Sequence, residues 1–342
     1  MRQSVGWKAG VHMRQEGRRS AEVGGVGLAL VACLLWGGQF PVAKAILPNL
    51  GALYLTAIRY AIIGALFVAA LVLFEGRRAL RYEGRLPQAA ILGILGFASF
   101  NLLAFGGLAH TRPENAALIS ATMPLQTALI LWVWRRARPP RATLLCMLAA
   151  LCGVGLVISR GQWSFLTSGK VGYGDLMVLA AYLGWVLYTM FVRHFTGWSP
   201  LRFTTLTVLP GAAVVLVIAV GAAATGLART PSLAQVGDSW WQLLYMIVGS
   251  GIASVLSWNA SVQRLGAQNA ILFMNLVPVV TLVIEIAQGN GVNDAELAGA
   301  SLTIGALVVN NLLSRRARGG IASSESMEHP APSPLATMEV AP

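Results

Sequence analysis

Residues 201–224 read LRFTTLTVLPGAAVVLVIAVGAAA, and this stretch decides the fold class. Its unbroken apolar run over residues 213–219 does not alternate with polar residues, so it does not fit a strand of a membrane barrel. A helix of about 20 apolar residues, rising about 1.5 Å per residue, spans a hydrocarbon core that is roughly 30 Å thick. The stretch therefore predicts a membrane-spanning helix, whose backbone satisfies its own hydrogen bonds.

The composition of the whole chain points the same way. Of the 342 residues, 56% are apolar and 11% are charged, whereas soluble domains carry about 25% charged residues. The three cysteines (Cys33, Cys146 and Cys152) lie in apolar runs, which argues against a disulfide scaffold or a CxxC metal site. Length alone would allow a soluble enzyme of two domains, but this composition favours a polytopic membrane protein.

Measuring the chain against the length of a spanning helix predicts an all-α integral membrane protein with ten transmembrane helices. The predicted spans are 23–47, 51–74, 88–109, 114–134, 142–159, 173–195, 201–224, 241–263, 267–288 and 296–314.

The basic residues divide unequally between the two sides of these spans. With the amino terminus in the cytoplasm, nineteen Lys and Arg residues lie in cytoplasmic segments, five lie at the outer ends and Arg59 lies within a span. This positive-inside pattern predicts a multi-pass protein of the cytoplasmic membrane, with a basic tail (1–22) and a disordered tail (319–342) both in the cytoplasm. It also accounts for the net charge of +12 without a nucleic-acid partner, because no folded basic domain carries the charge.

The chain also repeats itself internally. Trp36 is followed eight residues later by Lys44, as Trp185 is by Arg193, and the pattern Gly-x-Ala-Ser occurs at both 96–99 and 251–254. The two predicted repeats are 23–159 and 173–314. Because each holds five spans, an odd number, the second must be inserted upside down relative to the first. Inverted repeats place a binding site near the membrane midplane and suit alternating access.

Short motifs lie in a fixed order and spacing along residues 23–314. They are Leu35-Trp36-Gly37-Gly38 with Phe40 and Lys44, Arg59-Tyr60, Asn115-Ala116-Ala117 with Pro124, Gly174-Asp175-Leu176 with Trp185, Tyr188 and Arg193, Ser257-Trp258-Asn259 with Gln263-Arg264-Leu265-Gly266, and Asn269-Ala270 with Pro278. This order resembles the EamA type of the drug/metabolite transporter superfamily, whose members have two five-helix repeats. The resemblance implies export of metabolites such as amino acids or of toxic compounds.

Two places depart from the pattern of that family. It usually has a Gly-Glu step after the proline of its fourth and ninth helices, and here these places read Arg136-Ala137-Arg138 and Asn290-Gly291-Val292. Glu285 instead lies inside the ninth span. The departures leave the fold prediction intact, but they weaken any assignment of the family's substrate or coupling ion to this chain.

The first span carries one wall of a candidate substrate site. Trp36, Phe40 and Lys44 are spaced by four and share a helix face, and Gln39 is a further candidate beside them. The matching stripe in the sixth span contains Tyr182 and Trp185.

Aromatic rings with polar tips can stack on a substrate and hydrogen-bond to it. Trp185 lies too deep in its span for an interfacial belt, so it is predicted to line a cavity. For Tyr182 and Tyr188, a cavity and an interfacial belt both remain open.

Prolines mark candidate hinges. Pro41 lacks the N–H that would bond to the carbonyl of Gly37, so the helix is expected to open there. An opened helix at membrane depth is tolerated only beside protein or a water-filled cavity. Gly37 and Pro41 are therefore either a hinge with a site wall or a packing kink, and Pro124 and Pro278 are the hinge candidates of the fourth and ninth spans.

Two ionisable residues inside spans cost the most free energy to insert into the membrane. Arg at a helix centre costs about 2.5–3.5 kcal/mol on insertion scales. Arg59 could contact an anionic group of a substrate, such as a carboxylate, or pair structurally with a backbone carbonyl or with Glu285. Glu285 could carry a coupling proton, since burial raises a carboxyl pKa, or could merely reach the outer interface.

Four more polar groups within spans are candidates for contact with a substrate. They are Asn101, Trp258, Asn259 and Asn275. Asn residues in membranes also hold helices together, so both roles stay open. The four histidines lie in tails or at opposite faces and suggest neither a metal site nor a catalytic dyad.

These features predict a secondary transporter of small organic metabolites, working outward by alternating access across the lipid bilayer. A proton or an exchanged solute is the candidate coupling partner, no cofactor is expected, and the chain could act as a monomer or homodimer. The alternatives are an intramembrane enzyme, which would need converging His, Asp, Glu, Ser or Cys groups, and a non-transporting receptor or scaffold. No GxxxxGK[ST] motif is present, so ATP would require a separate subunit.

Overall fold

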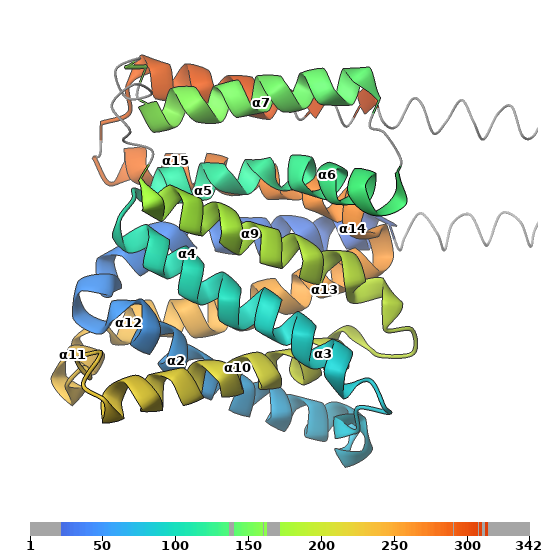
Figure 1. Cartoon of the computed structure of the whole chain (residues 1–342), viewed down its shortest axis with the longest axis vertical. Coiled ribbons are helices and arrows are strands. Elements are labelled where there is room, and N and C mark those ends of the chain that lie inside the picture. The colour runs from blue at the N-terminus through green and yellow to red at the C-terminus, as the bar shows by residue number, and fades with distance from the viewer. Residues whose placement is uncertain are drawn as a thin grey trace, which may run out of the picture.

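The computed structural model describes residues 22–136, 140–159, 161–162, 172–289, 291–306, 308–309 and 312–313. In this part of the chain all regular structure is helical, and the helices lie roughly alongside one another (Figure 1). The predicted tails fall outside the described residues, except for Glu22.

The described helices form two sets, one in each half of the chain. The first half has a helix over 22–37 followed by α2 (Gln39–Glu75), α3 (Leu86–Gly93), α4 (Phe100–Ala109), α5 (Pro113–Ile119), α6 (Met123–Arg135) and α7 (Arg141–Ser159). The second half has α9 (Tyr173–Phe191), α10 (Pro200–Ala224), α11 (Leu233–Asp238), α12 (Trp240–Leu244), α13 (Ser254–Leu265), α14 (Ala267–Ala270), α15 (Leu276–Ala287) and a helix over 294–306.

The helices are interrupted at corresponding places in the two halves. A π-helical segment, η2 (Ile94–Ser99), joins α3 to α4, and another, η5 (Tyr245–Ala253), joins α12 to α13. Short 3₁₀ turns, η3 (Ser120–Thr122) and η6 (Ile271–Asn275), separate α5 from α6 and α14 from α15. Such segments are frequent at functional sites. Their matched positions agree with the internal repeat in the sequence.

α2 contains the boundary between the first two predicted spans. Gly51 has φ 64° and ψ 162°, so two helices meet there at a kink. A residue with a Cβ rarely adopts this backbone conformation, which accounts for the glycine. One turn earlier, Pro48 removes a backbone donor, which also favours the bend.

Six described helical segments are long and apolar enough to cross a membrane. They are Glu22–Glu75, Leu86–Ala109, Asn115–Trp134, Tyr173–His194, Pro200–Ala224 and Trp240–Leu265. The first covers two predicted spans, and two shorter apolar helices, Arg141–Gly153 and Ile271–Ala287, correspond to two others. The all-helical membrane architecture is thus confirmed, while the count of ten crossings remains a prediction.

The two halves of the chain pack closely where α4 of the first meets α9 of the second. A Cβ on Gly107 would lie 2.4 Å from the carbonyl oxygen of Gly174, and a Cβ on Gly174 would lie 2.7 Å from that of Gly107. Only glycines allow the two backbones to approach so closely, as in small-residue packing between membrane helices. The halves therefore pack directly against each other where α4 ends and α9 begins.

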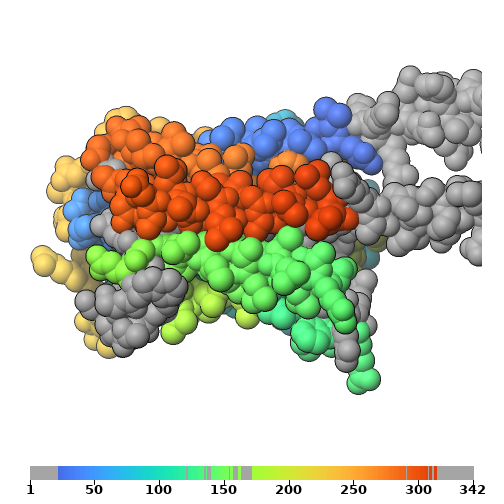
Figure 2. Space-filling view, turned by 90° about the horizontal axis from the view of Figure 1, so that it is seen from above, coloured from blue at the N-terminus to red at the C-terminus, as the bar shows by residue number. Residues whose placement is uncertain are grey.

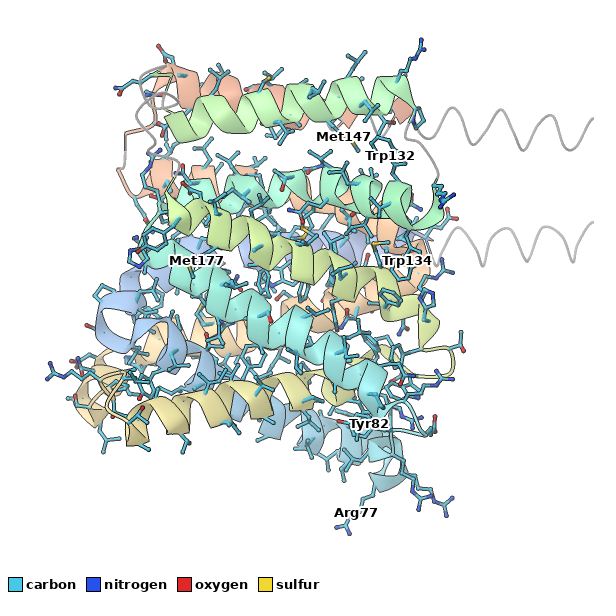
Figure 3. All side chains as sticks on the ribbon, viewed as in Figure 1. Arg77, Tyr82, Trp132, Trp134, Met147 and Met177 are labelled. Atoms are coloured by element: carbon cyan, nitrogen blue, oxygen red, sulfur yellow. The ribbon has the colours of Figure 1, made fainter. Side chains whose placement is uncertain are left out.

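Two further helices lie at one edge of the molecule (Figure 1). α7 and the helix over 294–306 lie side by side on one face (Figure 2), where the Thr303 hydroxyl donates to the Ala150 carbonyl at 3.3 Å. Tyr82, Trp132 and Trp134 lie at different heights but toward the same end of the helices (Figure 3). Trp134 is 62% exposed, as expected for a ring at a membrane–water interface.

Candidate functional site

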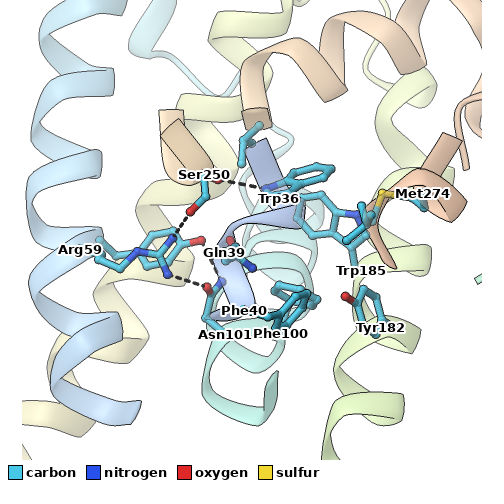
Figure 4. A pocket seen from close by; sticks show the side chains of 13 residues that line it. Trp36, Gln39, Phe40, Arg59, Phe100, Asn101, Tyr182, Trp185, Ser250 and Met274 are labelled. Atoms are coloured by element: carbon cyan, nitrogen blue, oxygen red, sulfur yellow. Dashed lines mark hydrogen bonds between the residues drawn. The ribbon is translucent and has the colours of Figure 1, made fainter. Parts of the chain in front are cut away.

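A small cavity lies between the two halves (Figure 4). Its volume is about 20 Å³, which is room for about one water molecule. The first half contributes the side chains of Trp36, Gln39, Phe40, Arg59, Tyr60, Phe100 and Asn101, and the second half contributes those of Tyr182, Trp185, Ser250, Val255, Met274 and Val277. Both repeats therefore build one site.

Aromatic rings form one end of the cavity. The ring centroids of Trp36 and Trp185 are 5.4 Å apart at an interplanar angle of 89°, an edge-to-face contact between the halves. The ring centroid of Phe100 lies 5.4 Å from that of Trp185 and 5.5 Å from that of Tyr182. The rings are rigid and amphipathic, so they can hold an apolar group while offering polar edges.

Trp36 is oriented by the opening in its helix. The helix over 22–37 ends at a turn beside Gly38, and the indole Nε1 of Trp36 donates to the Ser250 carbonyl at 3.0 Å. The carbonyl of Gly37, which Pro41 deprives of its helical donor, lies 2.7 Å from the Thr281 hydroxyl. The opened turn is thus stabilised by α15 of the other half.

Arg59 forms the polar end of the cavity and is only 1% exposed. Its Nε and Nη2 donate to the Met246 carbonyl at 3.2 and 3.0 Å. Nη2 also donates to Ser250 Oγ, and Nη1 donates to Asn101 Oδ1, both at 3.3 Å. Of the two structural pairings that the sequence allowed for this residue, the structure shows the one with a backbone carbonyl.

Asn101 is fixed in turn by its neighbours. Its Nδ2 donates to the hydroxyl of Tyr60 at 2.8 Å and to the Phe97 carbonyl at 2.9 Å, and its side chain is 2% exposed. This leaves its Oδ1 directed at Arg59. Asn101 therefore holds the guanidinium in place from the cavity side.

Three predicted substrate contacts lie outside the cavity lining, in a polar layer behind it. Asn259 Nδ2 donates to the hydroxyls of Tyr188 and Thr204, both at 2.7 Å. Trp258 Nε1 donates to Thr189 Oγ1 at 3.2 Å, while its ring packs 5.4 Å from that of Trp36. Through this ring the layer supports the cavity wall.

Lys44 lies away from the cavity, at the end of α4. Its Nζ donates to the carbonyls of Leu108, Ala109 and Thr111 at 2.6, 3.3 and 2.7 Å. A cation at a helix C-terminus satisfies carbonyls that lack helical partners and interacts favourably with the helix dipole. The Thr111 hydroxyl bonds at 2.5 Å to Asp175 in the first turn of α9, so this end joins both halves.

The remaining candidates do not line the cavity. Glu285 is buried in α15. Asn275 ends η6, next to the lining residue Met274, and its Oδ1 is buried without a hydrogen-bond partner among the described residues. Pro124 is in the first turn of α6, directly after η3, and Pro278 follows η6 in α15.

Several lining residues were not singled out from the sequence. Tyr60 and Phe100 are each adjacent to a predicted residue, Arg59 or Asn101, and could have been included on that ground. Ser250, Val255, Met274 and Val277 carry no local signal, because they reach the cavity through contacts between distant helices. Among the described residues no group of His, Cys, Asp or Glu is arranged to hold a metal ion.

Fold and cavity together define a class: a multi-pass membrane protein whose two repeats enclose a central site. The sequence profile of the EamA-like transporter family matches residues 23–159 and 172–312. The chain therefore belongs to the EamA-like transporter family, as its motifs suggested, and is a membrane transporter of that family.

Two relatives, one named a transporter and the other an exporter, support this class. The chain is 33% identical over 291 residues to the uncharacterized transporter YrdR of Bacillus subtilis, covering 84% of this chain and 91% of the relative. It is 26% identical over 299 residues to a probable terminal-alkyne amino-acid exporter of Streptantibioticus cattleyicolor, covering 85% and 93%. A solved crystal structure matches with a TM-score of 0.63 and 22% identity over 87% of this chain and 99% of its own, a likeness of fold alone.

Proposed function

We propose that this chain is a secondary transporter that exports small organic metabolites, such as amino acids, related compounds or drugs, across the cytoplasmic membrane. The observation that carries the proposal is the central cavity, because both halves supply its walls. A site shared by two inverted halves can open to either side when one half rocks against the other.

The closed cavity fits one state of such a cycle. Sites that bind small molecules usually measure about 300–1,000 Å³, whereas this cavity measures about 20 Å³. The halves must therefore separate or repack before a metabolite enters. We place the bending points at Gly37 with Pro41, at Pro124 and at Pro278, which lie beside the turn at Gly38 and the 3₁₀ segments η3 and η6.

We assign the two halves to residues 23–159 and 173–314, and the orientation to the positive-inside pattern. Both termini then lie in the cytoplasm. The end of α4 that Lys44 binds is the outer end, and the loop over 76–85 between α2 and α3 faces inward. The matches of the family profile to 23–159 and 172–312 support the division.

Within the cavity, five side chains would surround the substrate, namely those of Trp36, Gln39, Phe40, Trp185 and Tyr182. Arg59 and Asn101 would bind its polar group. Tyr188, Trp258 and Asn259 would support these walls, Asn275 would face the substrate once the cavity opens, and Lys44 would hold the outer end closed.

The substrate class has support from one relative. That relative is named a probable terminal-alkyne amino-acid exporter, and it covers most of this chain at 26% identity. An amino-acid-like solute would suit a cavity with a guanidinium at one end and rings at the other. A ligand-stabilisation screen over amino acids, purines and drug-like cations would identify the class.

Glu285 is our candidate for proton coupling. It is buried in α15, the helix that also stabilises the opened turn at Gly37 through Thr281. Glu285→Gln should remove the pH dependence of transport if this carboxyl carries the proton. An unchanged pH profile would exclude Glu285 from coupling and favour a facilitator or an exchanger.

Counterflow in proteoliposomes tests the proposal against its rivals. Purified protein should exchange a labelled metabolite for an unlabelled one across the bilayer. Chemical turnover of that metabolite would instead indicate an intramembrane enzyme, and binding without exchange would indicate a receptor or scaffold. Either result would contradict the transporter proposal.

A further inference from the structure

The cavity has two chemically different ends. Figure 4 shows Arg59, Asn101 and Ser250 on one side, and Trp36, Trp185 and Tyr182 on the other. The first side presents a buried cation, and the second presents aromatic surface. A ligand that fills the cavity must match both.

The charge of Arg59 has no anionic partner among the described residues. Its acceptors are one carbonyl, one hydroxyl and one amide oxygen, all neutral, and two of these four bonds are 3.3 Å long. No Asp or Glu is among the thirteen side chains that line the cavity. A cation removed from water is costly unless an opposite charge compensates it, and neutral oxygens compensate it only in part.

Donors also remain available beside this cation. A guanidinium has five N–H groups, and the hydrogen bonds to Met246, Ser250 and Asn101 use four of them, which leaves one on Nη1. Gln39 lines the cavity and its amide forms no hydrogen bond with any described residue. One N–H and one amide can together bind the two oxygens of a carboxylate.

The aromatic end has an unsatisfied donor of its own. Trp185 Nε1 is buried and has no acceptor in the described part of the chain. Buried polar atoms without partners are rare in folded proteins, and an unfilled binding site is one explanation. The rings of Trp36, Phe100 and Tyr182 around it would contact an apolar body.

We propose that the cavity selects amphipathic monoanions, with the carboxylate bound by Arg59 and Gln39 and an apolar or aromatic body held between the rings, and that it discriminates against cations. The proposal rests on the transport function proposed above and names its substrate class. A single guanidinium balances a single negative charge, so a monoanion leaves the occupied cavity neutral. A cation would place a second positive charge beside Arg59.

Three small compounds with the same phenyl body test this selectivity. 3-Phenylpropionate is an anion, phenylalanine a zwitterion and 2-phenylethylamine a cation. In binding to the purified full-length protein, measured by thermal stabilisation and by competition, the anion should bind at least about tenfold more tightly than the cation, with the zwitterion between them. Equal or tighter binding of the cation, or binding of none of the three, would overturn the proposal.

Variants locate the effect at Arg59. Asn101→Asp places a carboxylate where the Asn101 oxygen now lies, 3.3 Å from Arg59 Nη1, and so supplies an internal counter-ion. It should abolish the preference for the anion, as should Arg59→Gln, whereas Arg59→Lys should retain it. Asn49→Asp in α2 and Arg202→Gln in α10 make the same changes at residues that do not line the cavity, and they should leave the preference for the anion unchanged. Retained selectivity in Asn101→Asp would show that Arg59 is purely structural.

Counterflow separates this inference from the transport proposal. Exchange of cations that is faster than exchange of acids would support transport and overturn the selectivity. Tight binding of the acid without any exchange would support the selectivity and contradict transport.

Discussion

The carbonyl of Gly37 shows how one residue position links a sequence signal to the site. Pro41 withholds the donor that a regular helix would supply, and Thr281 of the other half supplies a hydroxyl 2.7 Å away. The same opening sets the position of Trp36 and Gln39 at the cavity. A bond from one half thus stabilises a bend in the other.

This arrangement predicts an interaction between two substitutions. Thr281→Val keeps the side-chain shape but leaves the buried carbonyl unsatisfied, which should lower stability by about 1–3 kcal/mol. Pro41→Ala restores an N–H that can bond to Gly37. In that background Thr281→Val should therefore cost clearly less, as measured by unfolding in detergent. Equal costs in both backgrounds would mean that Thr281 acts elsewhere.

Some site residues could be predicted from the sequence, and others could not. A tryptophan deep in a span, or an arginine at a span centre, is conspicuous by its cost or position, and Trp36, Trp185 and Arg59 all line the cavity. Ser250 and Met274 are ordinary residues of apolar helices. Only the packing of the two halves brings them to the cavity, and the spacing of residues along a helix does not encode that packing.

At the scale of elements, the C-terminal ends of α4 and α13 are counterparts in the repeat but differ in their contacts. Lys44 donates to three carbonyls at the end of α4. Its counterpart Arg193 lies near Gly266, after the end of α13, but its side chain forms no hydrogen bond with a described residue. The helix-face spacing grouped Lys44 with the cavity residues, because it could not show the longer reach of this side chain to α4.

Replacing the side chains of Lys44 and Arg193 should therefore change the stability of the protein by unequal amounts. Lys44→Met removes charge-assisted bonds from a helix end and should destabilise the protein by about 1.5–3 kcal/mol. Arg193→Met, the matched change at the other end, should have little effect on the unfolding temperature. Equal losses for both variants would contradict the assigned role of Lys44 at α4.

A polar contact joins the loop between α2 and α3 to the start of α10. Glu83 accepts from Arg202 Nη2 at 2.8 Å and from Trp198 Nε1 at 3.0 Å. These hydrogen bonds hold the pKa of the Glu83 carboxyl below its usual range. A depressed carboxyl pKa contributes stability above the unfolded-state value and loses it as the pH falls through the folded-state value.

Glu83→Gln should accordingly lower the unfolding temperature slightly at pH 7, and its effect should shrink as the pH falls through the lowered pKa of the native carboxyl. The change should be small, because the group is exposed to solvent. A larger effect of the substitution at the acidic pH would contradict this assignment.

At the scale of the whole molecule, composition and charge predicted the helical membrane fold, and fixed offsets predicted its repeat. The matched π-helical segments η2 and η5 were not predictable, since a π-helical turn leaves no distinct pattern in an apolar sequence. The close contact of Gly107 with Gly174 likewise depends on which helices meet.

Orientation gives a prediction at this scale. In a variant whose three native cysteines are replaced by serine, Leu227→Cys should react with an impermeant thiol reagent added to intact cells, because Leu227 is 84% exposed after α10. Arg78→Cys, in the loop after α2, should react only after the membrane is opened. The reverse pattern would invert the proposed topology.

The central claim is that the cavity between the two halves is where the transported metabolite binds, and counterflow by purified variants tests it most directly. Trp185→Ala and Arg59→Ala should each lower the exchange rate about tenfold or more in protein that remains folded and inserted. Trp134→Ala, which removes an exposed ring away from the cavity, should leave the rate near that of the unaltered protein. Unchanged exchange in both cavity variants would contradict the claim.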